Sequence, residues 1–254
     1  MINWDSVIED HDYAVPATQS FDDLVADLSQ ALADPDPEIR DGAPLMVLRE
    51  WIARGVIDGP RRSALGDAMA VRFTDQEIQA RTFAPLVLTY LVRAGEFRPG
   101  WLDAFADWFV TETDLRGYDD TIGWLHAVAH GADLLGAFGL RPEADPRLLL
   151  RLAATRLLTP TDHVLEQQED DRLARALDIV LAREDLTEQT VTAWLEPVAQ
   201  AFRTLPRGPV PAWYSNTVRT LRPLYIRVHR GTDRPCRQAL TAALTEVLDL
   251  VDAR

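Results

Sequence analysis

Two histidines and an aspartate near the middle of the chain have the types and spacing that could form a functional site. His126, His130 and Asp133 are four and three residues apart, so on an α-helix they lie within about 60° of one another. The other positions of residues 121–138 are mostly apolar or small. A helix side that faces water usually carries longer charged side chains. We therefore expect one helix over 121–138, with a polar stripe that faces a confined polar space.

Three interpretations of this stripe remain open. In the first, the side chains hydrogen-bond neighbouring helices and only satisfy buried polar groups. In the second, they line a pocket for a small ligand or a peptide, because short polar groups in an apolar wall confer specificity. In the third, His126 and His130 hold a divalent metal, with Asp133 as a further ligand. Ala127 stands where H-E-x-x-H peptidases carry glutamate, which excludes that class of enzyme.

A polar loop directly before this segment could contribute to the same site. It holds Arg116 and Asp119, and Trp124 follows it. Asp120 or Thr121 is the expected N-cap of the helix. Arg116 would then reach the mouth of the site, although an ion pair within the loop explains it equally well. The candidate ligand-binding residues are Arg116, Asp119, Trp124, His126, His130 and Asp133.

Arginine alone carries the positive charge of the chain. None of its 26 basic residues is a lysine, which excludes a Walker-type phosphate loop, a kinase-type ATP lysine and a lysine Schiff base. The glycine patterns of dinucleotide-binding folds and of serine hydrolases are also missing. The usual nucleotide-dependent and serine-hydrolase mechanisms therefore do not apply.

The net charge of −14 argues against nucleic acid and anionic membranes as partners, because binding to phosphates needs a surplus of cations. No run of 18 apolar residues is present, and residues 1–12 lack the basic start and apolar stretch of a secretory signal. Cys236 is the only cysteine, which excludes an internal disulfide and fits a reducing compartment. We expect a cytoplasmic protein whose partner is a protein or a small molecule.

The charge is spread unevenly along the chain. Residues 203–240 carry eight arginines and a single acidic residue, Asp233, whereas residues 1–202 carry 36 acidic residues and 17 arginines. We expect the arginines of 203–240 to pair with an acidic helix around residues 166–171, or with a second copy of the chain in a homo-oligomer. Anion binding is the remaining alternative for these arginines.

Helical periodicity extends over nearly the whole chain. Apolar residues recur at three- and four-residue spacing, and no convincing strand alternation is present, which predicts an all-α protein. Turn sequences rich in proline, glycine and aspartate separate the segments. The expected helices lie near residues 21–32, 38–54, 60–71, 75–93, 99–110, 121–138, 146–158, 167–182, 187–203, 211–229 and 233–250.

A weak internal repeat suggests how these helices are organised. The openings at residues 36–40 and 75–79 are 39 residues apart, and their helices end near Gly55 and Gly95. This is the period of HEAT-like or armadillo-like helix pairs. We expect a single domain over 1–254, built as a HEAT/armadillo-like α-solenoid of about five helical hairpins. An irregular helical bundle is the alternative.

Four stretches of the sequence resemble a bacterial family labelled domain of unknown function 2785. They are D-L-R-G at 114–117, G-W-L-H-A-V-A-H-G-A-D-L at 123–134, D-P-E-I-R-D at 36–41 and R-T-F-A-P-L at 81–86. The resemblance implies an all-helical fold and brings no established activity. It also implies where the relevant site lies, namely at Arg116, His126, His130 and Asp133.

Three functions are compatible with these observations. We favour a binding protein for a small ligand or peptide, with its site on the 121–138 helix. A metal-dependent enzyme is the first alternative, in which His126 and His130 hold the ion and Asp133 or Asp119 acts as a further ligand or base. A pure protein-interaction scaffold is the second. The sequence does not specify a cofactor, a reaction or an oligomeric state.

Overall fold

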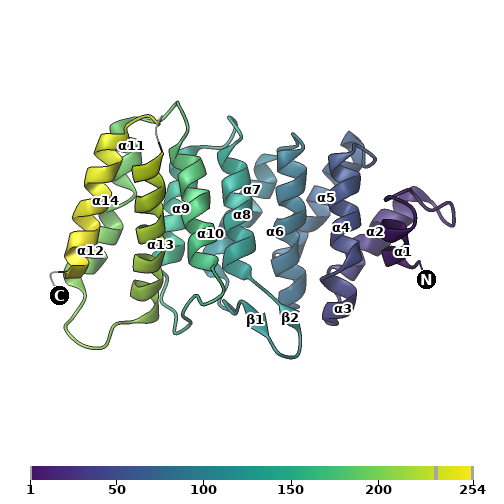
Figure 1. Cartoon of the computed structure of the whole chain (residues 1–254), viewed down its shortest axis with the longest axis horizontal. Coiled ribbons are helices and arrows are strands. Elements are labelled where there is room, and N and C mark those ends of the chain that lie inside the picture. The colour runs from purple at the N-terminus through teal and green to yellow at the C-terminus, as the bar shows by residue number, and fades with distance from the viewer. Residues whose placement is uncertain (1, 232–233, 253–254) are drawn as a thin grey trace.

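The chain folds mostly into helices, as its computed structural model shows for residues 2–231 and 234–252 (Figure 1). Asp233 lies outside these described residues. The helices are α1 (Trp4–Glu9), α2 (Phe21–Ala31), α3 (Pro37–Arg40), α4 (Ala43–Ala53), α5 (Gly59–Arg72), α6 (Ile78–Arg93), α7 (Pro99–Thr111), α8 (Ala127–Gly139), α9 (Pro146–Leu158), α10 (Glu169–Leu181), α11 (Glu188–Ala193), α12 (Glu196–Thr204), α13 (Ala212–Arg230) and α14 (Arg237–Asp252). Two short strands, β1 (Tyr118–Asp119) and β2 (Gly123–Trp124), form a hairpin. The all-α prediction is confirmed.

The helices stand side by side in two layers (Figure 1). In the first layer α4, α6, α8, α10, α13 and α14 follow one another, each packed on the next. In the second layer α5 packs on α7, α7 on α9 and α9 on α12. The hairpin lies at one edge of this stack, at the lower ends of α6 and α8 in the view of Figure 1. A HEAT-like repeat remains a prediction.

Helix α8 lies at the centre of the stack, between α6 and α10. Nearly all of its residues are buried, because small side chains let its neighbours approach on every side. A Cβ atom at Gly131, for example, would overlap the ring of Phe109 on α7. The close approach of α8 to its neighbours therefore depends on residues without bulk at these positions.

Side-chain caps and prolines place the starts of several helices. Asp58 accepts a hydrogen bond from the backbone N–H of Arg61, and Asp145 accepts one from that of Arg147. Each cap is followed within two residues by a proline, which suits the first turn of a helix. Helix α9 consequently spans the predicted residues 146–158.

Two segments predicted as single helices are each divided. Residues 38–54 form α3 and α4 because the chain leaves the helical conformation at Gly42. Residues 187–203 form α11 and α12, which are separated at Trp194 and Leu195. Pro197 explains the second break, since it has no N–H to continue the hydrogen-bond ladder from α11.

The arginine-rich segment pairs with an acidic helix inside the same chain. Arg219 Nε on α13 lies 2.8 Å from Asp170 Oδ2 at the start of α10, and Arg227 lies 2.9 Å from Asp171. The expected pairing between α13 and the acidic residues near 166–171 is thus confirmed. These contacts hold two neighbouring helices of the first layer together.

A search of the described residues for transmembrane segments finds none. No helix there is both long enough and apolar enough to cross a bilayer.

Candidate functional site

The polypeptide before α8 is a β-hairpin and not the first part of a helix. β1 and β2 pair antiparallel, with Tyr118 opposite Trp124 and Asp119 opposite Gly123. α8 begins only at Ala127. The prediction of one helix over 121–138 is therefore wrong for its first six residues.

Local hydrogen bonds explain this difference. The Asp119 carboxylate accepts from the backbone N–H groups of Thr121, at 2.9 Å, and Ile122, at 3.1 Å. Such aspartate turns compete with helix formation. Gly123 then has a φ of 71°, which favours glycine. The N-cap of α8 is His126, so the expectation of Asp120 or Thr121 at this position is also wrong.

A buried arginine from α3 holds the hairpin in place. Arg40 has 0% of its surface exposed, and its guanidinium donates to the backbone carbonyls of Ile122 and Trp124. Its Nε lies 2.8 Å from Asp41 Oδ1, and its Cζ lies 5.0 Å from the ring centre of Phe83. Arg40 was not among the predicted site residues. Its partner carbonyls are 82 and 84 positions away, and no local pattern indicates them.

Two glycines let the loop fit closely against its surroundings. A Cβ atom at Gly117 would overlap Oε1 of Glu169. A Cβ atom at Gly123 would lie 2.7 Å from Cβ of Pro37. The loop is thus packed against both the start of α10 and the start of α3.

His126 is held between an exposed tryptophan and a buried carboxylate. Its Nδ1 lies 3.2 Å from Oε1 of Glu169, a fully buried residue at the start of α10. The indole of Trp124 stacks on its ring, with the ring centres 4.6 Å apart and the planes 9° apart. The backbone of His126 is left-handed, with φ 53°, and that of Gln168 beside Glu169 has φ 64°. Left-handed backbone at non-glycine residues is uncommon and often marks functional sites.

His130 lies behind His126, one helical turn into α8. It is 6% exposed, and its Nδ1 lies 2.9 Å from the backbone carbonyl of Thr82 on α6. The edge of its ring meets Phe83, at 5.6 Å between ring centres. The centres of the two imidazoles are 5.5 Å apart. The structure therefore brings His126 and His130 together, as predicted.

The acceptors at Nδ1 require a proton on that nitrogen in both imidazoles. A carbonyl or ionised carboxylate oxygen accepts hydrogen bonds only, so Nδ1 carries a proton in both rings. Neither Nε2 atom has a hydrogen-bond partner among the described residues. The pair therefore leaves two Nε2 atoms open to a ligand, about one helical turn apart.

The surroundings favour an ionised Glu169 carboxylate and a neutral His130 ring. Burial raises the pKa of Glu169, but hydrogen bonds from His126 and from the backbone N–H groups of Glu169 and Gln167 outweigh it, so the pKa lies below its ordinary value. Burial, together with the positive charge of Arg172, holds the pKa of His130 well below its ordinary value. At neutral pH the carboxylate is thus ionised and the His130 ring is neutral.

Asp133 belongs to a different environment from the two imidazoles. Its carboxylate contacts Arg172 and lies 3.0 Å from Arg175, both on α10. Asp133 thus links α8 to α10. No group of three or more His, Cys, Asp or Glu side chains in the described residues is arranged to hold a metal ion. The metal hypothesis, in which His126 and His130 are the ligands and Asp133 or Asp119 a further one, stays a prediction.

Arg116 and Asp119 form ion pairs inside the loop. Arg116 lies 2.6 Å from Asp114 and also contacts Asp119, which is the alternative considered from the sequence. Two aromatic side chains beside them are more accessible. Tyr118 and Trp124 are 47% and 43% exposed and meet edge to face at 5.0 Å. Tyr118 was missed by sequence reasoning, because its pairing depends on the unexpected hairpin.

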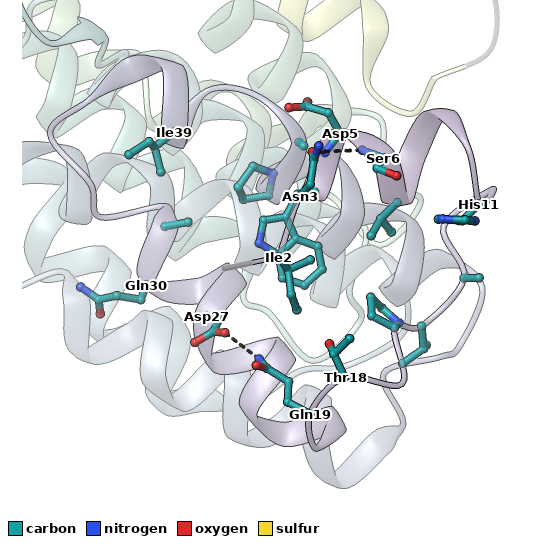
Figure 2. Close-up of a pocket in the computed structure, with 18 of the residues that line it drawn as sticks. Ile2, Asn3, Asp5, Ser6, His11, Thr18, Gln19, Asp27, Gln30 and Ile39 are labelled. Atoms are coloured by element: carbon teal, nitrogen blue, oxygen red, sulfur yellow. Dashed lines mark hydrogen bonds between the residues drawn. The ribbon is translucent and has the colours of Figure 1, made fainter.

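Two sizeable cavities lie away from the imidazole pair. One, of about 1110 Å³, is at the N-terminal end of the stack. Figure 2 shows its polar lining, in which Gln19 donates to Asp27 at 2.6 Å. The other, of about 610 Å³, lies between α9 and α11. Neither is lined by His126 or His130, so the confined space expected beside the polar stripe is not one of these cavities.

Comparison with known proteins identifies a family for this chain. A search of curated proteins and a search of solved structures each find no match. A family model described as protein of unknown function (DUF2785) matches residues 71–226, which include the hairpin, both histidines and Glu169. Because the match covers more than half of the chain, the protein belongs to the DUF2785 family.

Proposed function

We propose that this protein is a binding protein, and that its ligand donates hydrogen bonds to the Nε2 atoms of His126 and His130. The observation that carries the proposal is the anchoring of each imidazole through Nδ1 alone. A histidine that only satisfies buried groups would be expected to use both nitrogens. Here a carboxylate and a carbonyl orient the rings, and the acceptor side of each ring is left for a partner.

The exposed aromatic residues suggest the kind of ligand. Trp124 stacks on His126 and meets Tyr118, so a flat or aliphatic group could pack against them while an N–H or O–H group reaches an imidazole. Exposed tryptophan and tyrosine on a rigid support are typical of binding sites. Arg40 supplies that rigidity by holding the hairpin carbonyls. A peptide, or a small molecule with amide or amine groups, combines such an N–H donor with a flat or aliphatic group.

The fold supports the same proposal. The two layers of paired helices and the repeat offset in the sequence support a HEAT-like solenoid, in which edge loops present a site on a rigid stack. The single cysteine supports a cytoplasmic location.

One contact favours a second function, general-base catalysis. A carboxylate at Nδ1 of a histidine orients the ring and stabilises its protonated form, so that Nε2 can take a proton from a substrate. Glu169 stands in this position beside His126, at 3.2 Å. The proton acceptor would be His126, with Glu169 as a positioning residue.

Substitution by asparagine separates a binding role from a structural one. The amide N–H of asparagine takes the place of Nδ1–H, and asparagine has no atom at the position of Nε2. The His126→Asn/His130→Asn variant should therefore stay folded and lose the ligand. His229→Asn, at an exposed position on α13, is the matched control.

A displayed library of random dodecapeptides, selected on the wild-type protein, provides the probe. We expect the selected peptides to bind the double variant at least about tenfold more weakly, and to bind His229→Asn unchanged. Peptides that bind the folded double variant with full affinity would refute the proposal. Nitrogen NMR of the free protein gives an independent test, because protonated Nε2 atoms at pH 7 would also contradict it.

A further inference from the structure

A second site is suggested by the cavity of about 610 Å³ between α9 and α11. Its inner wall includes Leu150, Ala154 and Trp194, which belong to the buried core. The Trp194 indole N–H is already satisfied by the carbonyl of Val191, at 3.0 Å, so the indole adds no unpaired polar atom to this wall. The cavity therefore offers an apolar floor of the size that small ligands occupy.

The packing of α11 and α12 accounts for the opening of this cavity. Both α11 and α12 pack on α14, but only α12 also packs closely on α9. The surface of α9 beside α11 is therefore left open, and it lines the cavity.

The charges around this cavity are of one sign. Arg147 and Arg151 line it from adjacent turns of α9, and no aspartate or glutamate lines it, although the chain carries 40 acidic residues. Side chains four residues apart on a helix are neighbours. Among the described residues, neither guanidinium has an ion pair or a side-chain hydrogen bond. By contrast, two arginines of α10 and two of α13 each pair with an aspartate, namely Arg172, Arg175, Arg219 and Arg227.

We infer that this cavity binds a small amphiphilic anion, with a carboxylate as the head group and an aliphatic or aromatic body. Two adjacent guanidinium groups suit a carboxylate because they donate in a planar fork. The apolar body would cover Leu150, Ala154 and Trp194. This inference is independent of the proposed imidazole site, since no residue is shared.

Calorimetric titration with sodium decanoate below its micelle concentration tests the inference. We expect saturable binding of one molecule per chain to the wild-type protein. The Arg147→Gln/Arg151→Gln variant should bind at least about tenfold more weakly. The matched control is Arg222→Gln/Arg230→Gln on α13, which removes the same charge from two exposed arginines and should leave the affinity unchanged.

Further measurements distinguish binding at the inferred site from nonspecific binding of decanoate to the protein surface. Ala193→Trp adds a bulky side chain at an exposed position of the cavity wall and should block decanoate. Decanol and decyltrimethylammonium should bind far more weakly than decanoate. Equal binding of these probes, unchanged binding to the Arg147→Gln/Arg151→Gln variant, or binding to anionic vesicles without binding of free decanoate would each overturn the inference.

Discussion

Replacing His130 by asparagine should remove a specific part of the pH dependence of stability. His130 is 6% exposed, and burial together with Arg172 holds its pKa well below its ordinary value of about 6.5. In the unfolded chain the same ring recovers the ordinary pKa. Below pH 6.5 the unfolded state therefore binds a proton that the folded state does not bind.

The sign and the size follow from this difference. A base whose pKa is depressed by folding contributes stability above its unfolded pKa, and that contribution is lost as the pH falls. Below pH 6.5 the loss of unfolding free energy approaches about 1.4 kcal/mol per pH unit. Between pH 7.5 and pH 5.0 the total loss is at most about 2 kcal/mol. Asparagine keeps the hydrogen bond to the Thr82 carbonyl and does not titrate, so its variant lacks this loss.

Urea unfolding of both proteins at pH 7.5, 6.5 and 5.0 measures the effect. Carboxylates contribute equally to the two proteins, so the difference between their free energies of unfolding isolates His130. We expect the wild type to lose about 2 kcal/mol relative to His130→Asn on acidification to pH 5.0. A difference that stays constant to within about 0.5 kcal/mol would show that the ring is not buried in its neutral form.

Two further predictions concern the packing around the hairpin. Arg40→Lys should lower the free energy of unfolding by about 3 kcal/mol and increase acrylamide quenching of tryptophan fluorescence, since one ammonium cannot replace the forked guanidinium contacts. Gly117→Ala should destabilise the protein by about 1–3 kcal/mol in the same urea assay, because the added methyl group would overlap Glu169. The control is Gly100→Ala, which should not destabilise the protein, since no atom lies within 4 Å of the added Cβ.

Local sequence signals predicted most helices and their limits. Asp145 and Pro146 place the start of α9, and α9 ends at Leu158 as expected, because caps and prolines act on the nearest turn. The same reasoning failed at the hairpin. The apolar spacing of Ile122 and Leu125 suits a helix, and only the aspartate turn before Gly123 indicates otherwise.

The candidate site was predictable only in part. The closeness of His126 and His130 follows from their spacing in the chain, and the structure places their rings 5.5 Å apart. Their partners could not be predicted, since Glu169 and Thr82 are 43 and 48 positions away. Asp133 has the right helical spacing, but two arginines of α10 attract its carboxylate more strongly than a neutral site would.

The position of Arg40 has a consequence for work with shortened forms of this protein. The matched family region begins at residue 71, yet the guanidinium that holds the loop before α8 comes from residue 40. A fragment cut at the family boundary would leave the carbonyls of Ile122 and Trp124 without their donor and Trp124 without its fixed orientation. Any minimal fragment intended to retain ligand recognition must therefore begin before Asp34, whose own carbonyl receives the other arm of the same side chain.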